Sequence, residues 1–194
     1  MTQSLPVIFG CSGPELTPEE ERFFREVRPC GFIVFRRNCV SREQLRRLAT
    51  QLRATIDDAH APIQIDQEGG RVLRLRAPEW WEAPAAGAIG SAYDGDQERA
   101  VRAAELVGRI IGLQLSDVGV TVDCAPCVDL RYPFGHSVIG DRAFHADPKA
   151  VTRLGRAFAD GLASAGVQAT IKHLPGHGRA LVLLLDPESP VNKD

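Results

Sequence analysis

The chain has 194 residues, of which 44% are hydrophobic and 25% charged, an ordinary composition for a globular domain. Lysine and arginine number 23 against 25 acidic residues, and the net charge of −2 gives no basic surface for a nucleic acid or an anionic membrane. The longest apolar run, residues 180–185 (ALVLLL), is far shorter than the ~20 residues of a membrane span. No signal core is found, and five irregularly spaced cysteines are typical of free thiols, so we expect a cytoplasmic protein.

The predicted secondary structure alternates between strands and helices. Short apolar runs have the length of buried strands, and amphipathic segments that follow capping residues predict helices. In chain order we expect a strand at 7–10, a helix at 18–27, a strand at 31–35, a helix from 41 to 56, a strand at 62–67, a helix at 97–118, a strand at 121–129, a helix at 147–165 and a strand at 168–173. Residues 77–95, rich in proline, glycine, alanine and tryptophan, are expected to form a long loop.

Local motifs indicate where two of the helices begin. Thr17, with Glu20 three residues later and a proline at the first helical position, forms a capping box. Ser41 and Gln44 predict a second capping box. The helix after Ser41 has one apolar face, made of Leu45, Leu48, Leu52 and Ile56. The helix at 97–118 is expected to bury Val101, Ala104, Leu106, Ile110, Leu113 and Leu115.

This alternation predicts an α/β fold with a parallel sheet that helices cover on both faces. A doubly wound sheet and a (β/α)8 barrel both satisfy the pattern. Asp66, Asp129 and His173 follow three different strands. A barrel gathers its active site at the carboxyl ends of several strands, whereas an open sheet gathers its site at one switch point. The barrel is therefore favoured, in an incomplete form with about five of the eight βα units.

Polar side chains after the third predicted strand are candidates for a binding site. Asp66 comes directly after the apolar run and can accept hydrogen bonds from two neighbouring hydroxyls, as a sugar ring presents them. Arg71 and Arg74 carry planar donor groups that suit acids or hydroxyls. A structural role, with Asp66 capping the turn and the arginines in ion pairs, explains the same residues equally well.

A second polar group follows the fifth predicted strand. Lys172 and His173 end an apolar run, where a cation and an imidazole are costly unless they face a polar cavity. A core histidine with satisfied hydrogen bonds is the alternative for His173. His177 lies in the glycine-containing loop that follows. Four roles are open for it: a catalytic acid, a catalytic base, a ligand, or a residue on the loop surface. Asp141 and Arg142 are adjacent opposite charges, which usually form a surface pair.

Two further motifs are set aside. Cys124 and Cys127 form a C-x-x-C pair, but the pair lies in a strand-like run, has no second pair and opens no helix, so a redox or metal role is not favoured. The glycines at 10, 13, 69 and 70 lack the spacing of a nucleotide-binding loop, so no nucleotide is expected.

Four motifs together resemble one enzyme family. They are residues 66–72 (DQEGGRV), 125–129 (APCVD), 140–144 (GDRAF) and 172–178 (KHLPGHG). Across residues 5–182 the chain resembles the β-N-acetylglucosaminidases of glycoside hydrolase family 3, and the last motif separates that branch from the family's β-glucosidases. The resemblance implies a (β/α)8 TIM barrel that removes terminal β-linked N-acetylglucosamine, typically from muropeptides in bacterial cell-wall recycling. It implies a small-molecule sugar as the ligand and no metal or organic cofactor.

The resemblance also assigns roles to individual residues. Asp66, Arg74, Arg142, Lys172 and His173 match the groups that hold N-acetylglucosamine in the family. The family's mechanism is retaining: an aspartate nucleophile on a later strand forms a glycosyl-enzyme, and a histidine supported by an aspartate acts as acid and then as base. An Asp-Ser-His triplet after the Pro-Gly-His-Gly loop supplies that acid/base dyad.

At the dyad the sequence departs from the family pattern. Leu183 and Leu185 occupy the dyad positions, and the chain ends at Asp194 before a strand that would carry the nucleophile. Residues 1–182 are interpreted as the N-terminal part of a family 3 barrel and residues 183–194 as a tail foreign to the family. We expect the chain to bind the sugar and to be a very weak catalyst or none. A non-catalytic sugar-binding or regulatory fragment is the alternative.

Overall fold

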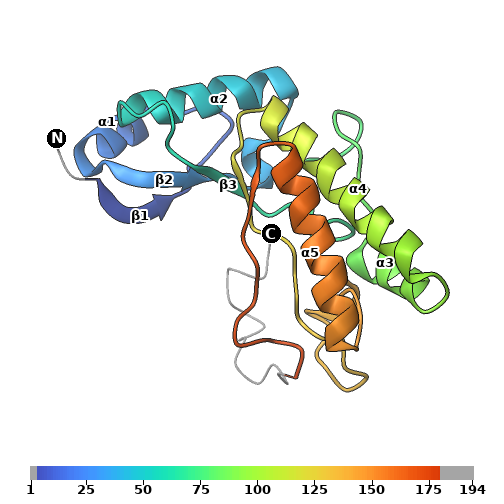
Figure 1. Cartoon of the computed structure of the whole chain (residues 1–194). Helices are drawn as coiled ribbons and strands as arrows, with labels where there is room; N and C mark the ends of the chain where they lie inside the picture. Colours follow the sequence, from blue (N-terminus) through green and yellow to red (C-terminus); the bar gives the residue numbers. More distant parts are fainter. Residues whose placement is uncertain (1–3, 180–194) are drawn as a thin grey trace.

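The computed structural model describes residues 4–179, in which five strands form one parallel sheet (Figure 1). The strands are β1 (Leu5–Phe9), β2 (Pro29–Ile33), β3 (Ile63–Ile65), β4 (Val122–Asp123) and β5 (Gln168–Ala169). Each strand pairs with the next along the chain, in the order β1-β2-β3-β4-β5. A doubly wound sheet reverses its order at a switch point, whereas a barrel keeps sequential order. The α/β prediction is confirmed, and the order is that of an incomplete barrel.

Helices connect the strands and cover the sheet. They are α1 (Pro18–Val27), α2 (Arg42–Thr55), α3 (Ala86–Tyr93), α4 (Gln97–Asp117) and α5 (Pro148–Ser164), with the short 3-10 helices η1 (Arg36–Asn38) and η2 (Gly140–Arg142). α1 and α2 lie along one side of β1–β3, and α4 and α5 pack lengthwise against each other (Figure 1). None of the helices between residues 4 and 179 is both long and apolar enough to cross a membrane.

The predicted helix starts are largely confirmed. Thr17 Oγ1 accepts from the Glu20 amide at 3.2 Å, and the Glu20 carboxylate accepts from the Thr17 amide at 3.0 Å, which completes the capping box. At α2, Ser41 Oγ accepts from the Gln44 amide at 3.2 Å. The Gln44 side chain, however, accepts from the Val40 amide rather than from Ser41, so the second box is half formed. The apolar face predicted for α2 is buried: Leu45, Leu48, Leu52 and Ile56.

The loop expected at residues 77–95 contains the helix α3, so that expectation was wrong in part. Gly90 of α3 lies so close to Phe144 that a Cβ atom on the glycine would stand 1.5 Å from the Phe144 carbonyl oxygen. Small residues therefore let α3 pack against backbone, with Ile89 and Tyr93 as its large buried side chains. Two large apolar residues on one helical turn are too few for helical periodicity to be visible in the sequence.

The buried face of α4 also differs from the expected one. Leu106, Ile110 and Leu113 are 41%, 40% and 54% exposed. The contact with α5 passes instead through Gly108, where a Cβ atom would stand 2.2 Å from the Phe158 carbonyl oxygen. Close approach of the two backbones therefore selects the face with small residues over the face with the largest ones. The residues that α4 buries are Ala100, Ala104, Val107, Gly108, Ile111, Gly112, Gln114 and Leu115.

The last two strands are shorter than predicted. β4 ends at Asp123, and Pro126 beyond it has no amide hydrogen to donate to a ladder. Residues 124–129 continue beside the segment that follows β5, joined to it by an isolated bridge between Cys127 and Lys172. The two segments therefore leave the sheet together, and their polar side chains meet beyond its carboxyl edge.

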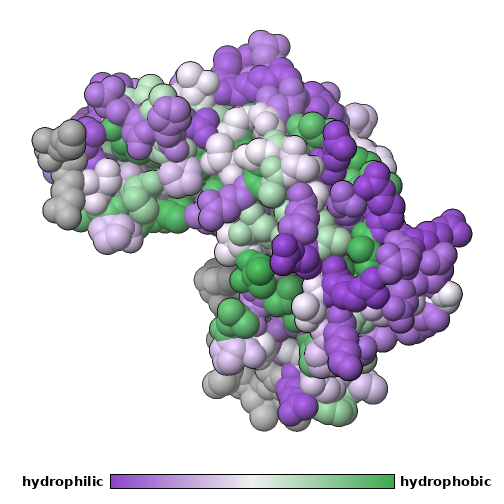
Figure 2. Space-filling view, viewed as in Figure 1, coloured by the Kyte–Doolittle hydropathy of each residue, from purple (hydrophilic) through white to green (hydrophobic). Residues whose placement is uncertain are grey.

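β1 is exposed, although its apolar run predicted a buried strand. Leu5, Val7 and Ile8 are 48%, 38% and 40% exposed, and within residues 4–179 no strand pairs with the outer edge of β1. The molecule has an angled outline, with β1, β2, α1 and α2 in one arm and α3, α4 and α5 in the other (Figure 1). Apolar surface is visible at the inner angle (Figure 2). The apolar sequence of β1 is typical of a buried strand, but residues 4–179 leave its side chains partly exposed.

Replacing Gly90 with alanine tests the packing of α3. In a helix this change normally stabilises by up to about 1 kcal/mol. Here the added methyl group meets the Phe144 carbonyl, and we expect the free energy of unfolding to fall by about 1–3 kcal/mol. Gly95→Ala is the matched control, because the nearest atom to its added methyl group is 3.9 Å away. Urea denaturation provides the comparison, and equal stabilities of the two variants would contradict the close contact.

Candidate functional site

A buried carboxylate, Glu68, lies between two cations at the carboxyl edge of the sheet. Lys172 Nζ, after β5, is 2.7 Å from Glu68 Oε1 and 2.8 Å from Asp66 Oδ1, after β3. Arg142, in η2, donates from Nη2 to Glu68 Oε1 at 2.8 Å and from Nε to Glu68 Oε2 at 2.9 Å. Arg74 Nη2 is 3.3 Å from Asp66 Oδ2. Five side chains from three segments of the chain thus form one connected set of ion pairs, which we call the ion-pair network.

The turn after β3 directs the acids toward these cations. Gly69 and Gly70 have φ values of 108° and 59°, in the region that favours glycine. Gln67 is 1% exposed, and its side-chain oxygen accepts from the amides of Arg74 and Leu75 at 2.8 and 3.0 Å. This side chain therefore ties the two ends of the turn together and fixes the acids on either side of it.

Asp141 and Arg142 do not pair with each other, so the expected surface pair was wrong. Asp141 accepts from Arg71 Nε at 2.9 Å, whereas the Arg142 side chain is 12% exposed and reaches Glu68. Arg71 Nη2 also donates to the carbonyls of residues 137–139. Both residues pair with the turn after β3: Asp141 with a residue 70 positions away in the sequence, and Arg142 with one 74 positions away.

His173 lies in a second cluster that adjoins the ion-pair network. Its Nδ1 is 2.6 Å from Oδ2 of Asp129, whose side chain is fully buried. Asp129 also accepts from the His177 amide at 2.5 Å and from the Cys127 thiol at 3.2 Å. On the other side of the ring, His173 Nε2 lies 3.4 Å from Arg142 Nη2. The five residues to which the family resemblance assigns the sugar are thus brought together, and His177 contributes to the cluster through its backbone.

Burial and charge compete at the acids of the network. Burial on its own raises the pKa of Asp66 and of Glu68. Hydrogen bonds from Lys172 to Asp66 and from Arg142 to Glu68 outweigh burial, so both pKa values lie below their usual range. Burial lowers the pKa of Lys172, but the charges of Glu68 and Asp66 produce a net rise. All three groups are therefore ionised at neutral pH.

Two acids were not predicted from the sequence: Glu68 within the network and Asp123 beside it. Glu68 stands in the same motif as Asp66, but nothing local distinguishes a bridging acid from a surface one. Asp123, at the end of β4, is fully buried; its Oδ1 accepts from the Gln67 amide at 2.9 Å, and its Oδ2 has no partner within the described residues. Burial raises the pKa of Asp123 well above its usual value. One signal was available for Asp123: it is an acid inside an apolar run that predicts a buried strand.

Cys127, Asp129 and His173 offer three ligand atoms that lie within 4.8 Å of one another. Zinc binds the thiolate of cysteine and a lone pair of imidazole. Burial raises the pKa of the Cys127 thiol to about 12, so the sulfur keeps its proton and donates to Asp129. The Arg142 guanidinium also adjoins the His173 ring and would repel a cation. We therefore interpret the three residues as a hydrogen-bonded cluster.

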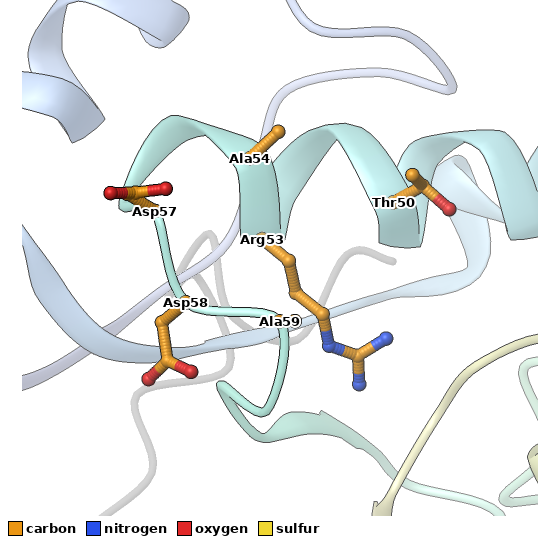
Figure 3. Close-up of a pocket in the computed structure, with 6 residues that line it drawn as sticks. All are labelled: Thr50, Arg53, Ala54, Asp57, Asp58 and Ala59. Carbon is orange, nitrogen blue, oxygen red and sulfur yellow. The ribbon is translucent and has the colours of Figure 1, made fainter.

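A surface pocket elsewhere is lined by Thr50, Arg53, Ala54, Asp57, Asp58 and Ala59, at the C-terminal end of α2 (Figure 3). The Arg53 side chain points away from Asp57 and Asp58 and donates to the carbonyls of Ala61 and Gly119. The pocket precedes β3, whereas barrel sites lie at the carboxyl ends of the strands. It is therefore not part of the candidate site.

Comparison with known proteins matches residues 16–184 to the glycosyl hydrolase family 3 N-terminal domain. The chain belongs to this family. A beta-hexosaminidase of Bordetella avium (strain 197N) is 38% identical over 173 residues, which are 89% of this chain and 49% of that protein. The crystal structure of NagZ from Neisseria gonorrhoeae in complex with N-trifluoroacetyl-D-glucosamine has a TM-score of 0.85 at 36% identity, over 91% of this chain and 52% of that chain.

A second solved structure, a glycoside hydrolase family 3 beta-N-acetylglucosaminidase from Paenibacillus sp. str. FPU-7, has a TM-score of 0.80 at 34% identity. The match covers 88% of this chain and 32% of that chain. This family 3 chain has the TIM-barrel-like α/β fold, with five strands in the sheet that residues 4–179 form. It spans about half the length of the curated relatives that it matches.

Glu68→Gln tests the centre of the network. The amide keeps the shape of the side chain but removes the charge between Lys172 and Arg142, so two partly buried cations lose their shared partner. We expect the free energy of unfolding to fall by about 2–4 kcal/mol. Glu43→Gln removes the partner of Arg47 at a side chain that is 82% exposed, and it should change little. Urea denaturation at neutral pH measures both, and similar losses would contradict a central role for Glu68.

Asp123→Asn tests the buried acid. Because the pKa of Asp123 is raised by folding, the wild type loses stability as the pH rises from about 3.9 toward the folded-state pKa, by at most about 1.4 kcal/mol per pH unit. Asparagine keeps the acceptor for the Gln67 amide and does not ionise. We expect near-equal stabilities below pH of about 4 and an advantage of the variant that grows as the pH rises. Denaturation midpoints of both proteins, measured from acidic to neutral pH, test this expectation. A difference in stability that does not change with pH would show that Asp123 does not titrate over this range.

Proposed function

We propose that this chain carries the sugar-recognition part of a glycoside hydrolase that removes terminal β-linked N-acetylglucosamine, with muropeptides of peptidoglycan recycling as the substrate class. The observation that carries the proposal is the connected arrangement of Asp66, Arg74, Arg142, Lys172 and His173 at the carboxyl edge of the sheet. Family 3 membership and the gonococcal NagZ complex with an N-acylated glucosamine support it.

The network offers both kinds of hydrogen-bonding group that a sugar ring needs. Asp66 accepts, while Lys172 and Arg74 donate. Their side chains are 21%, 16% and 27% exposed, so a ligand can reach them without disruption of the core. Each charge has a partner inside the network, and a hydroxyl can replace a long contact such as the 3.3 Å pair between Arg74 and Asp66 without leaving a bare charge.

Bond cleavage needs groups of a different kind. A retaining glycosidase uses one carboxylate as nucleophile and a separate proton donor. The two positions of the family's acid/base dyad hold Leu183 and Leu185, which have no proton to transfer and lie outside the described residues, as does the whole segment 183–194. We therefore propose that residues up to 182 confer sugar binding and that this polypeptide alone binds without hydrolysis, as a non-catalytic sugar-binding chain would.

Calorimetric titration with N-acetylglucosamine tests this function. We expect saturable binding to the wild type and a loss of affinity of at least about tenfold in Asp66→Ala, which removes the acceptor. Asp160→Ala, which removes an exposed acid from an i,i+4 pair with Arg156, should bind as the wild type does. Thermal transitions of the variants confirm that they fold. Absence of binding to a folded wild type would refute the proposal. Turnover of a β-N-acetylglucosaminide that Asp66→Ala abolishes would refute the expectation of inactivity.

A further inference from the structure

Asp129 divides three hydrogen bonds between its two oxygens. Oδ1 accepts from the His177 amide at 2.5 Å, and Oδ2 accepts from His173 Nδ1 at 2.6 Å and from the Cys127 thiol at 3.2 Å. Burial on its own raises the pKa of Asp129, but the hydrogen bonds from His173 and His177 outweigh it, and the pKa lies below its usual range. The group is therefore a carboxylate, which has acceptors and no donor.

The neighbours of His173 decide which ring nitrogen carries the proton. A neutral imidazole has one N–H donor and one lone pair. Because Nδ1 faces the Asp129 carboxylate, Nδ1 must hold the proton. The Arg142 guanidinium can only donate, and its Nη2 lies 3.4 Å from Nε2, so Nε2 presents its lone pair. Arg142 is fixed in turn by both oxygens of Glu68.

From this geometry we propose that Asp129 is a positioning residue, which fixes His173 as the Nδ1–H tautomer so that Nε2 offers a hydrogen-bond acceptor to a sugar hydroxyl. This inference rests on the proposed function. Lys172 and the arginines of the network only donate, so a hydroxyl that gives up its own proton needs an acceptor. His173 Nε2 is a neutral acceptor that adjoins the network at Arg142, the partner of Glu68. Its contact with Arg142 is long, at 3.4 Å, and a hydroxyl can replace it.

The groups that face the ring all agree with this tautomer. The carboxylate lies on Nδ1 and the guanidinium on Nε2, the His177 ring stands edge-on at 5.1 Å between centroids, and the Cys127 thiol donates to the same carboxylate oxygen as the ring. None of these groups within the described residues accepts a proton from Nε2. The ionisable groups around His173 are Cys127, Asp129, Arg142 and His177, with Glu68 and Lys172 behind Arg142.

Asp129→Asn separates positioning from packing, because asparagine has the same shape but only one acceptor oxygen. If that oxygen accepts from the His177 amide, the NH2 group faces His173 Nδ1. The NH2 group can only donate, so Nδ1 must then be the acceptor. The ring must then carry its proton on Nε2, opposite the Arg142 donor. The matched control is Cys127→Ala, which removes the third donor to Asp129 and leaves the His173 contact in place.

Ring 15N chemical shifts of the histidine-labelled protein, recorded at alkaline pH, identify the tautomer. The signals of His173 are assigned by their loss in His173→Gln. We expect the Nδ1–H tautomer in the wild type and in Cys127→Ala, and the Nε2–H tautomer or a mixture in Asp129→Asn. A merely structural role for Asp129 would leave the tautomer of a folded Asp129→Asn variant unchanged.

Titration with N-acetylglucosamine provides the functional measurement. Asp129→Asn should lose about tenfold in affinity, because Nε2 no longer accepts. Cys127→Ala should stay within about twofold of the wild type. If no protein binds the sugar while the tautomers are as expected, the proposed function fails and the positioning of the ring stands.

Three results would overturn the inference. They are an Nε2–H tautomer or an even mixture in the wild type, an unchanged tautomer in a folded Asp129→Asn variant, and an equal loss of sugar affinity in Cys127→Ala and Asp129→Asn. If Asp129→Asn shows no cooperative thermal transition, the tautomers of the wild type and of Cys127→Ala decide the question without it.

Discussion

Two cations cannot leave water at the edge of a sheet without an acid between them, and Glu68 is the acid that Lys172 and Arg142 share. The requirement joins three parts of the chain: the turn after β3, the helix η2 and the segment after β5. The glycines of that turn place Glu68 inward, and Gln67 holds the turn closed. The geometry of the candidate site follows from this one carboxylate and its bridging position.

The sequence predicted local features well and close packing poorly. The capping box of Thr17 and Glu20 and the apolar face of α2 depend on residues a few positions apart, and both are found in the structure. α3 and the buried face of α4 depend on Gly90 and Gly108, which approach the backbone of Phe144 and Phe158. Hydrophobic periodicity gives no weight to glycine, so packing that depends on the absence of a side chain leaves no periodic signal.

The same contrast applies to the candidate site. Polar residues at strand ends indicated which side chains meet, because the carboxyl ends of parallel strands share one edge of the sheet. Which acid pairs with which cation was not predictable, since Arg142 has Asp141 beside it in the sequence and still pairs with Glu68, 74 residues away. The burial of Asp123 likewise depends on how β3 and β4 stand side by side, which no spacing in the sequence encodes.

The candidate site is built from parts that barrel strands contribute independently of one another. Every ion pair of the network forms between residues 66 and 172, and the partners of His173 lie between 129 and 177. The residues of the candidate site therefore hold one another in place through their own charges and hydrogen bonds. Under the proposed function, sugar binding depends on contacts that all lie within residues 66–177.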